Sequence, residues 1–453
     1  MVPGTCSLDR PQLLEYLRQH YFRVPDALSG SCGVVLEWMV KDAAHTADGA
    51  CPAPHPDVGS RIATELSDLV PHLSDGPSLL ELSGGGPLRL PHGGHIGFSS
   101  GGQIRYESPL LPDPVRVVTD VRLHVGGLLH RLGGSGLRCV FQGMDPYHDP
   151  SDIPLHLTNL RQRLMEAYLD QIGTHGQYAM RCAYALQVNL HPGFGMEGAT
   201  RLAAADRLAP IMAAIFAHSP LHRMSATPFV TRRLHHILNM DPARTAPVGW
   251  RPDEDPAETL LKHALAVPVM LKDDGLGGAA ALADSPTFQD WCNLTHPQGP
   301  PTLLDWQTHL STLFPPVRHR GQIEIRITDA QEFRWFPVPL MLWWSLLWIG
   351  DPNEWCEPAS GVTDIDRDAI AERGIRNPNI VVAAHKIFDR ALEILETSNS
   401  HRIPVSLLGL VRAFRLRYLD RGRMPADDLI DRQHHTPGSG PAPSDHYPAG
   451  APA

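Results

Sequence analysis

The chain has 453 residues, 42% of them hydrophobic, and its 39 basic and 49 acidic residues give a formal net charge of −10. This length and composition allow a large buried core. The acidic balance argues against nucleic acid and anionic membranes as main partners, because both require a basic surface. A nucleotide remains possible, since it needs only a local group of positive charges.

The seven cysteines are scattered and include no Cys-x-x-Cys pair. This pattern predicts reduced thiols in a cytoplasmic protein rather than disulfides or a zinc site. The N-terminus lacks the apolar run of a signal peptide. The most apolar stretch, residues 338–349, is too short to cross a bilayer, so we expect a buried helix there.

Apolar spacing and turn residues predict helices and strands that mix without regular alternation. In chain order they are helix 8–23, strand 32–40, two short strands between 79 and 107, helix 115–132, strand 137–142, helix 160–172, strand 178–190, helix 200–218, strand 322–328, helix 337–348 and helix 379–397. The irregular order favours an α+β fold over a doubly wound sheet.

The strand predicted at 322–328 carries the strongest chemical signal. Glu324 and Arg326 are two residues apart, so their side chains should share a face of the strand. Such a pair is an ordinary surface ion pair in most proteins. It is also an arrangement in which the carboxylate binds Mg²⁺ while the guanidinium holds a phosphate. The isoleucines between and beside them predict that the opposite face is buried.

Gln187 and Asn189 form a similar same-face pair in the strand LQVNL. They are either a hydrogen-bonded core pair or a polar floor that orients the charged groups of an amino acid. Other motifs are weaker: the glycine clusters lack a Walker lysine, no histidine pair with a third ligand predicts zinc, and there is no Gly-x-Ser-x-Gly elbow.

A set of longer segments occurs in a fixed order along the chain. It includes MEAYLDQIG (165–173), YALQVNLHPG (184–193), DPARTAPV (241–248) and HLSTLFPPVRHRGQIEIRITDAQ (309–331). Together these segments resemble the glutamate–cysteine ligases that begin ergothioneine synthesis, over roughly residues 30–432.

The resemblance implies a glutamine-synthetase-like α+β fold, in which a curved antiparallel sheet flanked by helices forms a funnel. It implies one catalytic domain over residues 1–432, followed by a disordered tail over 433–453. The implied chemistry is phosphorylation of the glutamate γ-carboxylate by ATP, with Mg²⁺ bound at the phosphates. The amine of cysteine, or of another small molecule, then displaces the phosphate.

Carried over position by position, the resemblance assigns roles to eight residues. Metal ligands are Glu37 and Glu324; nucleotide-contacting residues are Arg326 and Gln103; residues that bind glutamate are Gln187, Asn189 and Arg232; catalytic residues are Arg326 and Arg105.

The sequence also departs from the family pattern, because Val35, Ser99 and Arg105 stand where carboxylates are expected. At about 4 Å and an effective dielectric near 20, each like-charge contact between Arg105 and a cation costs roughly 4 kcal/mol. Three explanations remain open. Arg105 replaces the charge of one metal ion, Glu107 replaces a lost ligand, or the protein no longer makes γ-glutamyl bonds. The alternatives to the ligase are therefore a non-catalytic relative and a ligase for a different amine.

Overall fold

The computed structural model describes residues 8–23, 29–42, 88–90, 92–275, 278–293, 296–356, 367–397 and 403–434. The expected tail over 433–453 lies outside these ranges apart from Gln433 and His434, which are helical rather than irregular. The part of the short-strand region before residue 88 also lies outside them.

The strands are β1 (Cys32–Asp42), β2 (Leu88–Arg89), β3 (His95–Phe98), β4 (Ile104–Glu107), β5 (Leu137–Val140), β6 (Ala185–Leu190), β7 (Leu221–His222), β8 (Ser225–Ala226), β9 (Lys272–Asp273), β10 (Ala279–Ala280), β11 (Val317–His319) and β12 (Ile323–Asp329). The α-helices are α1 (Arg10–His20), α4 (Pro114–Gly134), α5 (Leu160–Ile172), α6 (His175–Arg181), α7 (Met196–Ile215), α8 (Arg232–Met240), α9 (Pro242–Thr245), α10 (Pro256–Ala266), α11 (Phe288–Asn293), α12 (Leu303–Ser311), α13 (Pro337–Trp344), α14 (Arg367–Arg373), α15 (Pro378–Thr397), α16 (Val405–Arg417) and α17 (Pro425–His434).

An eight-stranded antiparallel sheet forms the centre of the molecule. Its order is β11-β12-β6-β1-β4-β3-β2, and β5 pairs with the last residues of β1. Strand β1 is long enough to pair with β6 and β4 on its two sides and, through its last residues, with β5. The α+β architecture with an antiparallel sheet is therefore confirmed.

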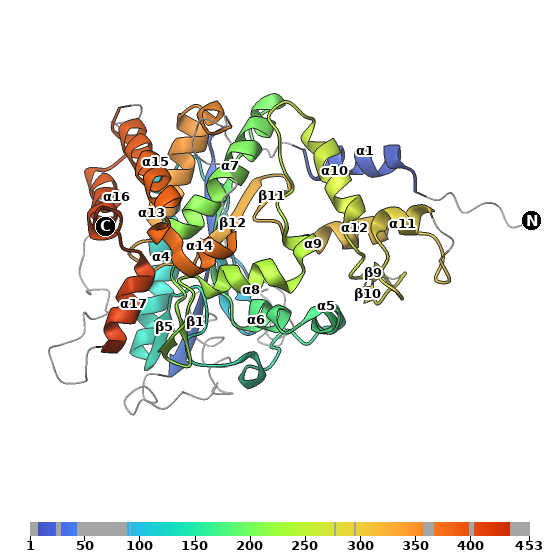
Figure 1. The fold of residues 1–453 in the computed structure, drawn as a ribbon, viewed down its shortest axis with the longest axis horizontal. Coiled ribbons are helices and arrows are strands. Elements are labelled where there is room, and N and C mark those ends of the chain that lie inside the picture. The colour runs from blue at the N-terminus through green and yellow to red at the C-terminus, as the bar shows by residue number, and fades with distance from the viewer. Residues whose placement is uncertain are drawn as a thin grey trace, which may run out of the picture.

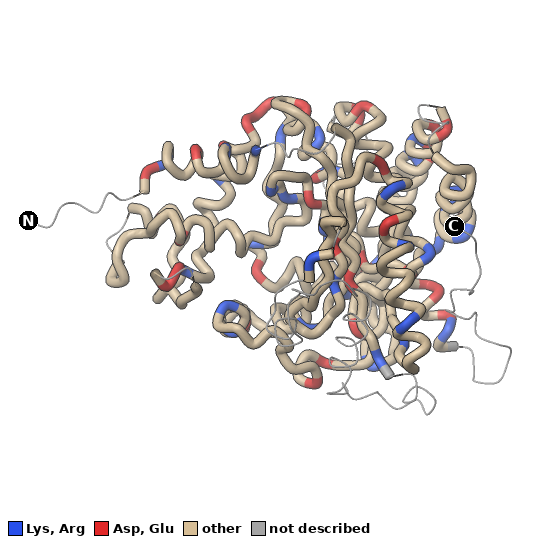
Figure 2. Tube along the Cα trace, turned by 180° about the vertical axis from the view of Figure 1, so that it is seen from behind, with Lys and Arg blue, Asp and Glu red and all other residues tan. Residues whose placement is uncertain are grey.

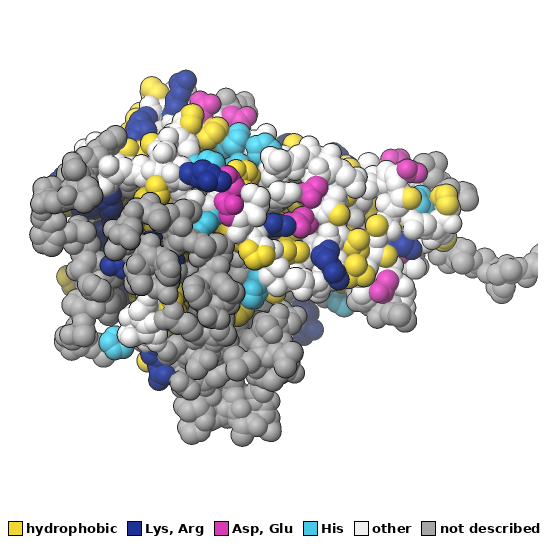
Figure 3. Space-filling model, turned by 90° about the horizontal axis from the view of Figure 1, so that it is seen from below, with side chains coloured by type: hydrophobic (Ala, Val, Ile, Leu, Met, Phe, Trp, Pro, Cys, Tyr) yellow, Lys and Arg dark blue, Asp and Glu magenta, His cyan; other side chains and the backbone are white. Residues whose placement is uncertain are grey.

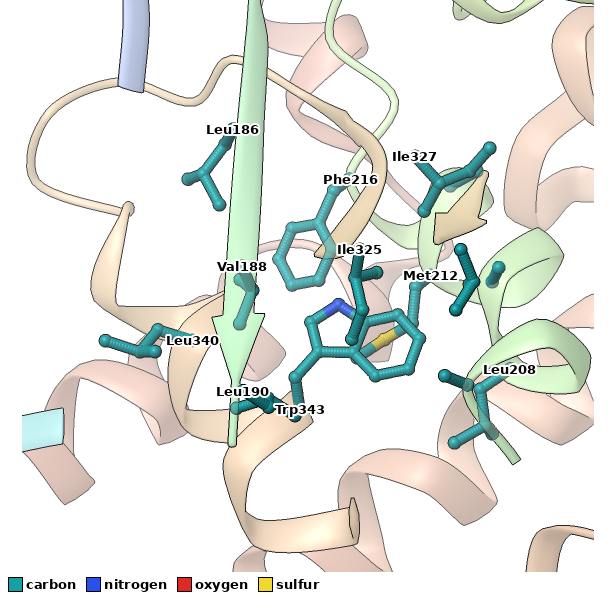
Figure 4. Packing of buried hydrophobic residues seen from close by; sticks show 14 of the residues in the cluster. Leu186, Val188, Leu190, Leu208, Met212, Phe216, Ile325, Ile327, Leu340 and Trp343 are labelled. Atoms are coloured by element: carbon teal, nitrogen blue, oxygen red, sulfur yellow. The ribbon is translucent and has the colours of Figure 1, made fainter. Parts of the chain in front are cut away.

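One face of the sheet forms the hydrophobic core. Val188 of β6 and Ile325 of β12 face Met212 of α7 and Phe216, the residue after that helix, with Trp343 of α13 packed between them (Figure 4). All five side chains are buried. Because side chains alternate along a strand, burying these positions directs their neighbours to the opposite face.

Helices lie on two sides of the sheet (Figure 1). Helices α13, α15, α16 and α17 group on one side, whereas α1, α10, α11 and α12 extend away on the other as a separate helical arm. Helix α1 joins α10 through exposed ion pairs, Arg10 with Glu258 at 2.6 Å and Arg18 with Asp255 at 2.8 Å. Exposed pairs of this kind stabilise a fold only weakly.

The prediction of one long strand over 178–190 is wrong in its first half. Residues His175–Arg181 form α6, and the strand begins only at Ala185. Helix α6 packs closely on α5, since a Cβ on Gly176 would lie 2.4 Å from the Cβ of Leu169. The segment HGQYAMR contains good helix formers, and this tertiary contact overrides the apolar alternation.

The remaining predicted elements are present, with shifted ends, except that the described part of the region 79–107 contains three short strands, β2, β3 and β4, where two were predicted. The apolar stretch at 338–349 is helical as predicted; its last turn, Ser345–Ile349, is π-helical. Among the described residues no helix combines the length and apolarity needed to cross a membrane. The five described cysteines are free thiols. On the face seen in Figure 3, acidic and basic side chains are interspersed outside the grey atoms.

Candidate active site

The sheet face opposite the core carries most of the residues predicted to act in chemistry. Strand register fixes their places: Glu37 lies opposite Arg105, Val35 lies between Glu107 and Gln187, and Glu324 lies opposite Asn189. Charged residues of both signs accordingly meet along the strands in the middle of the molecule (Figure 2). We call this surface the polar face, comprising Glu37, Arg105, Glu107, Gln187, Asn189, Arg318, Glu324 and Arg326.

At the β1–β4 end of the polar face, Arg105 bridges two carboxylates. Its Nη1 lies 3.4 Å from Glu37 Oε1, and its Nη2 lies 3.1 Å from Glu107 Oε2. Glu37 also accepts hydrogen bonds from Ser99 Oγ at 2.9 Å and from the Ala185 backbone N–H at 3.0 Å. Burial alone would lower the pKa of Arg105, but Glu37 and Glu107 outweigh it and raise that pKa. Arg105 therefore stays charged.

At the β11–β12 end, Glu324 is bound by a different arginine. Arg318 donates from Nε at 2.8 Å and from Nη2 at 2.5 Å to Glu324 Oε2. Only 6% of Glu324 is exposed. Burial alone would raise the pKa of Glu324, but the charges of Arg318 and then Arg326 outweigh it and lower that pKa. Glu324 is thus an ionised carboxylate paired with Arg318 rather than with Arg326.

Arg326 is the cation of this face that has no partner within the described part of the chain. No ion pair or hydrogen bond engages its guanidinium, which lies over the Phe314 ring at 5.8 Å from the centroid. Burial, and next repulsion from Arg318, lower the pKa of Arg326 to about 9. The group remains protonated at neutral pH, and an anion is the ligand that would satisfy it.

Gln187 and Asn189 lie on β6 between the two charged ends. Gln187 Nε2 donates to Asn189 Oδ1 at 2.7 Å, and both side chains are buried. The hydrogen-bonded pair foreseen from the sequence is therefore present, and it sits on the polar face.

Gln103 lies in the turn between β3 and β4, where both ends of its amide bind backbone. Its Oε1 accepts from the Gly101 N–H at 2.8 Å, and its Nε2 donates to the Met180 and Ala183 carbonyls at 3.1 and 3.3 Å. These bonds attach the turn to the end of α6. Gln103 thereby positions the segment that carries Ser99.

Arg232 lies apart from the amide pair in its described contacts. As the first residue of α8 it is almost fully buried, donates from Nη1 to the Leu221 carbonyl, and lies 5.7 Å from the centre of the Tyr178 ring. Burial lowers its pKa. The structure does not bring its guanidinium to Gln187 or Asn189 through any contact of the described residues.

Two arginines that sequence reasoning did not select organise the β12 strand. Arg318 could have been found, because a hairpin turn at 320–322 places it opposite Glu324. Arg233, the neighbour of Arg232, donates to the carbonyls of Arg326 at 2.8 Å and Ile327 at 3.2 Å. These bonds fall where the register of β12 shifts against β6, so Arg233 fixes the backbone that carries Arg326.

The two predicted metal ligands do not form a common site. Glu324 pairs in register with Asn189, whereas Glu37 binds Ala185, four residues back along β6. That separation is roughly 13 Å along the strand, much more than the distance between ligands of one ion. Each carboxylate is also already held by a guanidinium. A cluster of Mg²⁺ ions bound by several carboxylates does not fit these residues.

Among the described residues, one trio of side chains comes close enough to share an ion, and it lies elsewhere. His92, Asp120 and His124 meet beside Tyr106, whose neighbours in β4 face the polar side. The His92 and His124 rings stack at 3.7 Å with 16° between their planes. Each ring already places a nitrogen near the same Asp120 Oδ1, at 3.1 Å for His92 and 3.2 Å for His124, so we interpret this trio as a hydrogen-bonded link between α4 and the β2–β3 turn.

Comparisons of the sequence with a family model and with individual known proteins all match glutamate–cysteine ligases. The family model described as glutamate-cysteine ligase family 2 (GCS2) matches residues 60–355. Glutamate–cysteine ligase EgtA of Mycobacterium tuberculosis strain H37Rv is 29% identical over 350 residues, which cover 76% of this chain and 78% of the relative. EgtA of Mycolicibacterium smegmatis is 29% identical over 349 residues, which cover 76% and 79%. A chloroplastic glutamate–cysteine ligase of Medicago truncatula is 27% identical over 260 residues, which cover 56% and 50%.

The fold is similar to that of a solved glutamate–cysteine ligase from Francisella tularensis, crystallised in complex with AMP. The TM-score is 0.51 at 12% identity, and the match covers 89% of this chain and 85% of the other. At this identity the likeness concerns the fold alone.

Proposed function

Since the chain belongs to glutamate–cysteine ligase family 2, we propose that its polar face performs the ATP-dependent ligation of the glutamate γ-carboxylate to the amine of cysteine. The observation that carries the assignment to this face is the unpaired guanidinium of Arg326, which lies on the same sheet face as the Gln187–Asn189 amide pair.

The reaction has two steps, and each conserves atoms and electrons. In the first, a γ-carboxylate oxygen of glutamate attacks the γ-phosphorus of ATP, the bond to the β–γ bridging oxygen breaks, and ADP leaves. In the second, the amine nitrogen of cysteine attacks the acyl carbon, the bond from that carbon to the phosphate oxygen breaks, and the nitrogen loses a proton. Both steps develop negative charge on phosphate oxygens, which fixed guanidinium groups stabilise.

The roles proposed for individual residues follow from their places. Arg326 contacts the transferring phosphoryl group, and Gln187 with Asn189 orients the glutamate. Arg232 remains our proposal for the group that holds the glutamate carboxylate. Gln103 acts as a positioning residue through the turn that it holds. Mg²⁺ would accompany ATP in solution, and we assign it no protein ligand.

Incubation of the purified chain with ATP, Mg²⁺, glutamate and cysteine tests this function. Mass spectrometry should detect γ-glutamylcysteine in step with phosphate release. Arg326→Met should lower the rate by at least about 100-fold, because one stabilising donor of this kind is worth that much. Arg334→Met is the matched control, since Arg334 is exposed and its ion pair, with Glu332, involves no residue of the polar face. Absence of product with cysteine and with a panel of other amines would reject the ligase.

The ion pair between Arg105 and Glu37 favours a second candidate function. In this case the chain is a family member that binds a nucleotide or an amino acid but forms no γ-glutamyl bond. Calorimetric binding without turnover would support this candidate. Product formed only with another amine would instead identify a different acceptor. A place in ergothioneine synthesis stays a prediction, which a neighbouring gene for oxidative sulfur transfer to histidine betaine would support.

A further inference from the structure

We propose that the polar face binds the nucleotide phosphates through guanidinium groups in place of divalent cations, so that nucleotide binding requires no divalent ion. The identity of the anion as a nucleotide rests on the proposed function. The electrostatic argument rests on contacts within the chain.

Among the described residues, each carboxylate of the polar face already lies beside a guanidinium group. Arg105 lies between Glu37 and Glu107, and Arg318 binds Glu324 with two hydrogen bonds. Strand pairing sets both arrangements, because Arg105 is opposite Glu37 and Arg318 is opposite Glu324. A divalent ion entering either place would have to displace a guanidinium that the sheet holds there.

The β11–β12 end also has a surplus of positive charge among the described residues. Four guanidinium groups, those of Arg161, Arg318, Arg320 and Arg326, lie in electrostatic reach of one another or of Glu324. Glu324 neutralises one of them. A polyphosphate carries several charges, and planar guanidinium groups bind phosphate oxygens in pairs.

The backbone that carries the unpaired guanidinium is also fixed before any anion binds. Arg233 donates to the carbonyl of Arg326 at 2.8 Å, and the Arg326 N–H donates to the Pro316 carbonyl at 2.9 Å. The Phe314 ring lies beneath the guanidinium. Fixing the backbone of a binding residue in advance lowers the entropy that is lost on binding, which favours affinity.

The test is calorimetric titration of the full chain with ATP, once in excess EDTA and once in excess Mg²⁺. The dissociation constants in the two conditions should agree within about threefold. Arg326→Met should weaken binding by at least about tenfold in both conditions, whereas the control Arg334→Met should leave it unchanged. Circular dichroism of each variant checks that the chain is folded.

A variant whose ATP binding should become dependent on Mg²⁺ makes the test sharper. Arg105→Glu removes the built-in cation beside Glu37 and Glu107 and leaves three carboxylates there. Its affinity for ATP should rise more than about tenfold when Mg²⁺ is added, while Arg105→Gln should show a smaller rise.

The outcomes separate this inference from the proposed function. Wild-type binding that strengthens more than about tenfold with Mg²⁺ overturns the inference, even if γ-glutamylcysteine is formed. Binding in EDTA without ligation of any amine rejects the proposed function and supports the inference. No ATP binding in either condition overturns the inference as well.

Discussion

Replacement of Glu324 by glutamine tests the ion pair at the β11–β12 end. The change keeps the shape of the side chain but leaves Arg318 without its counter-charge. Their side chains are only 8% and 13% exposed. Breaking a buried ion pair by removing one partner costs about 3–5 kcal/mol. Because the amide oxygen of glutamine can still accept one hydrogen bond from Arg318, we expect a loss of about 2–3 kcal/mol of unfolding free energy.

Urea unfolding measures this loss as a lower midpoint with an unchanged slope. A double-mutant cycle with Arg318→Gln isolates the pair, and its coupling energy should be at least about 1.5 kcal/mol. A Glu324→Gln loss below about 0.5 kcal/mol, or single-variant losses that add within that margin, would show that the pair is not formed.

The pH dependence gives an independent check of the same pair. The pKa of Glu324 in the folded chain lies below its ordinary 4.5, because Arg318 and Arg326 outweigh burial. The pair therefore contributes its full stability above pH 4.5 and loses it as the pH falls through the folded pKa. The stability gap between wild type and Glu324→Gln should shrink in that range. Glu324→Gln should also lower nucleotide-dependent phosphate release, because it releases the Arg318 guanidinium that Glu324 holds in the site, and full activity would contradict our placing of Glu324 in the site.

Three further changes probe the surroundings. Gly101→Ala should destabilise the chain by about 2 kcal/mol in thermal denaturation, because its Cβ would lie 2.3 Å from a carbonyl oxygen of α6, whereas Gly409→Ala meets open space and should not. Arg244→Met should cost at least about 3 kcal/mol in urea unfolding, because Arg244 is fully buried and paired with a carboxylate. A hydrogen bond to Asp120 raises the pKa of His124 above 6.5, so His124→Gln should lower stability below pH 6.5, with the gap closing as the pH rises through the folded pKa.

The alternation of side chains along strands made much of the polar face predictable. Gln187 and Asn189 are on one face because side chains along a strand repeat their direction every two residues. The same rule predicted that the isoleucines of β12 are buried on the opposite face. The alternation of side chains does not predict which residues on neighbouring strands form ion pairs with those of the polar face. Glu324 pairs with Arg318 because of the hairpin register, which depends on the length of a turn rather than on either residue.

The choice between Arg232 and Arg233 shows a second limit. The two arginines are adjacent in VTRR, and a helix directs neighbours about 100° apart. Arg233 reaches the carbonyls of β12, whereas Arg232 turns toward Tyr178. The rotation of α8 is set by its packing on α6 and β12, so a single sequence does not reveal which arginine meets the strand. The division of 178–190 into α6 and β6 has the same origin in tertiary packing.

The polar face differs from a metal-filled one in where its positive charge comes from. A bound ion can leave, and its occupancy follows the ion concentration, whereas Arg105 is attached to the strand opposite Glu37. The charge near Glu37 therefore depends on the β1–β4 register and is as stable as the sheet. A guanidinium neutralises phosphate only within its plane of N–H donors, so the orientation of Arg326 must be fixed in advance. The bonds from Arg233 to the β12 backbone fix the main chain from which Arg326 extends, which explains why an almost fully buried arginine is used there to hold carbonyl groups.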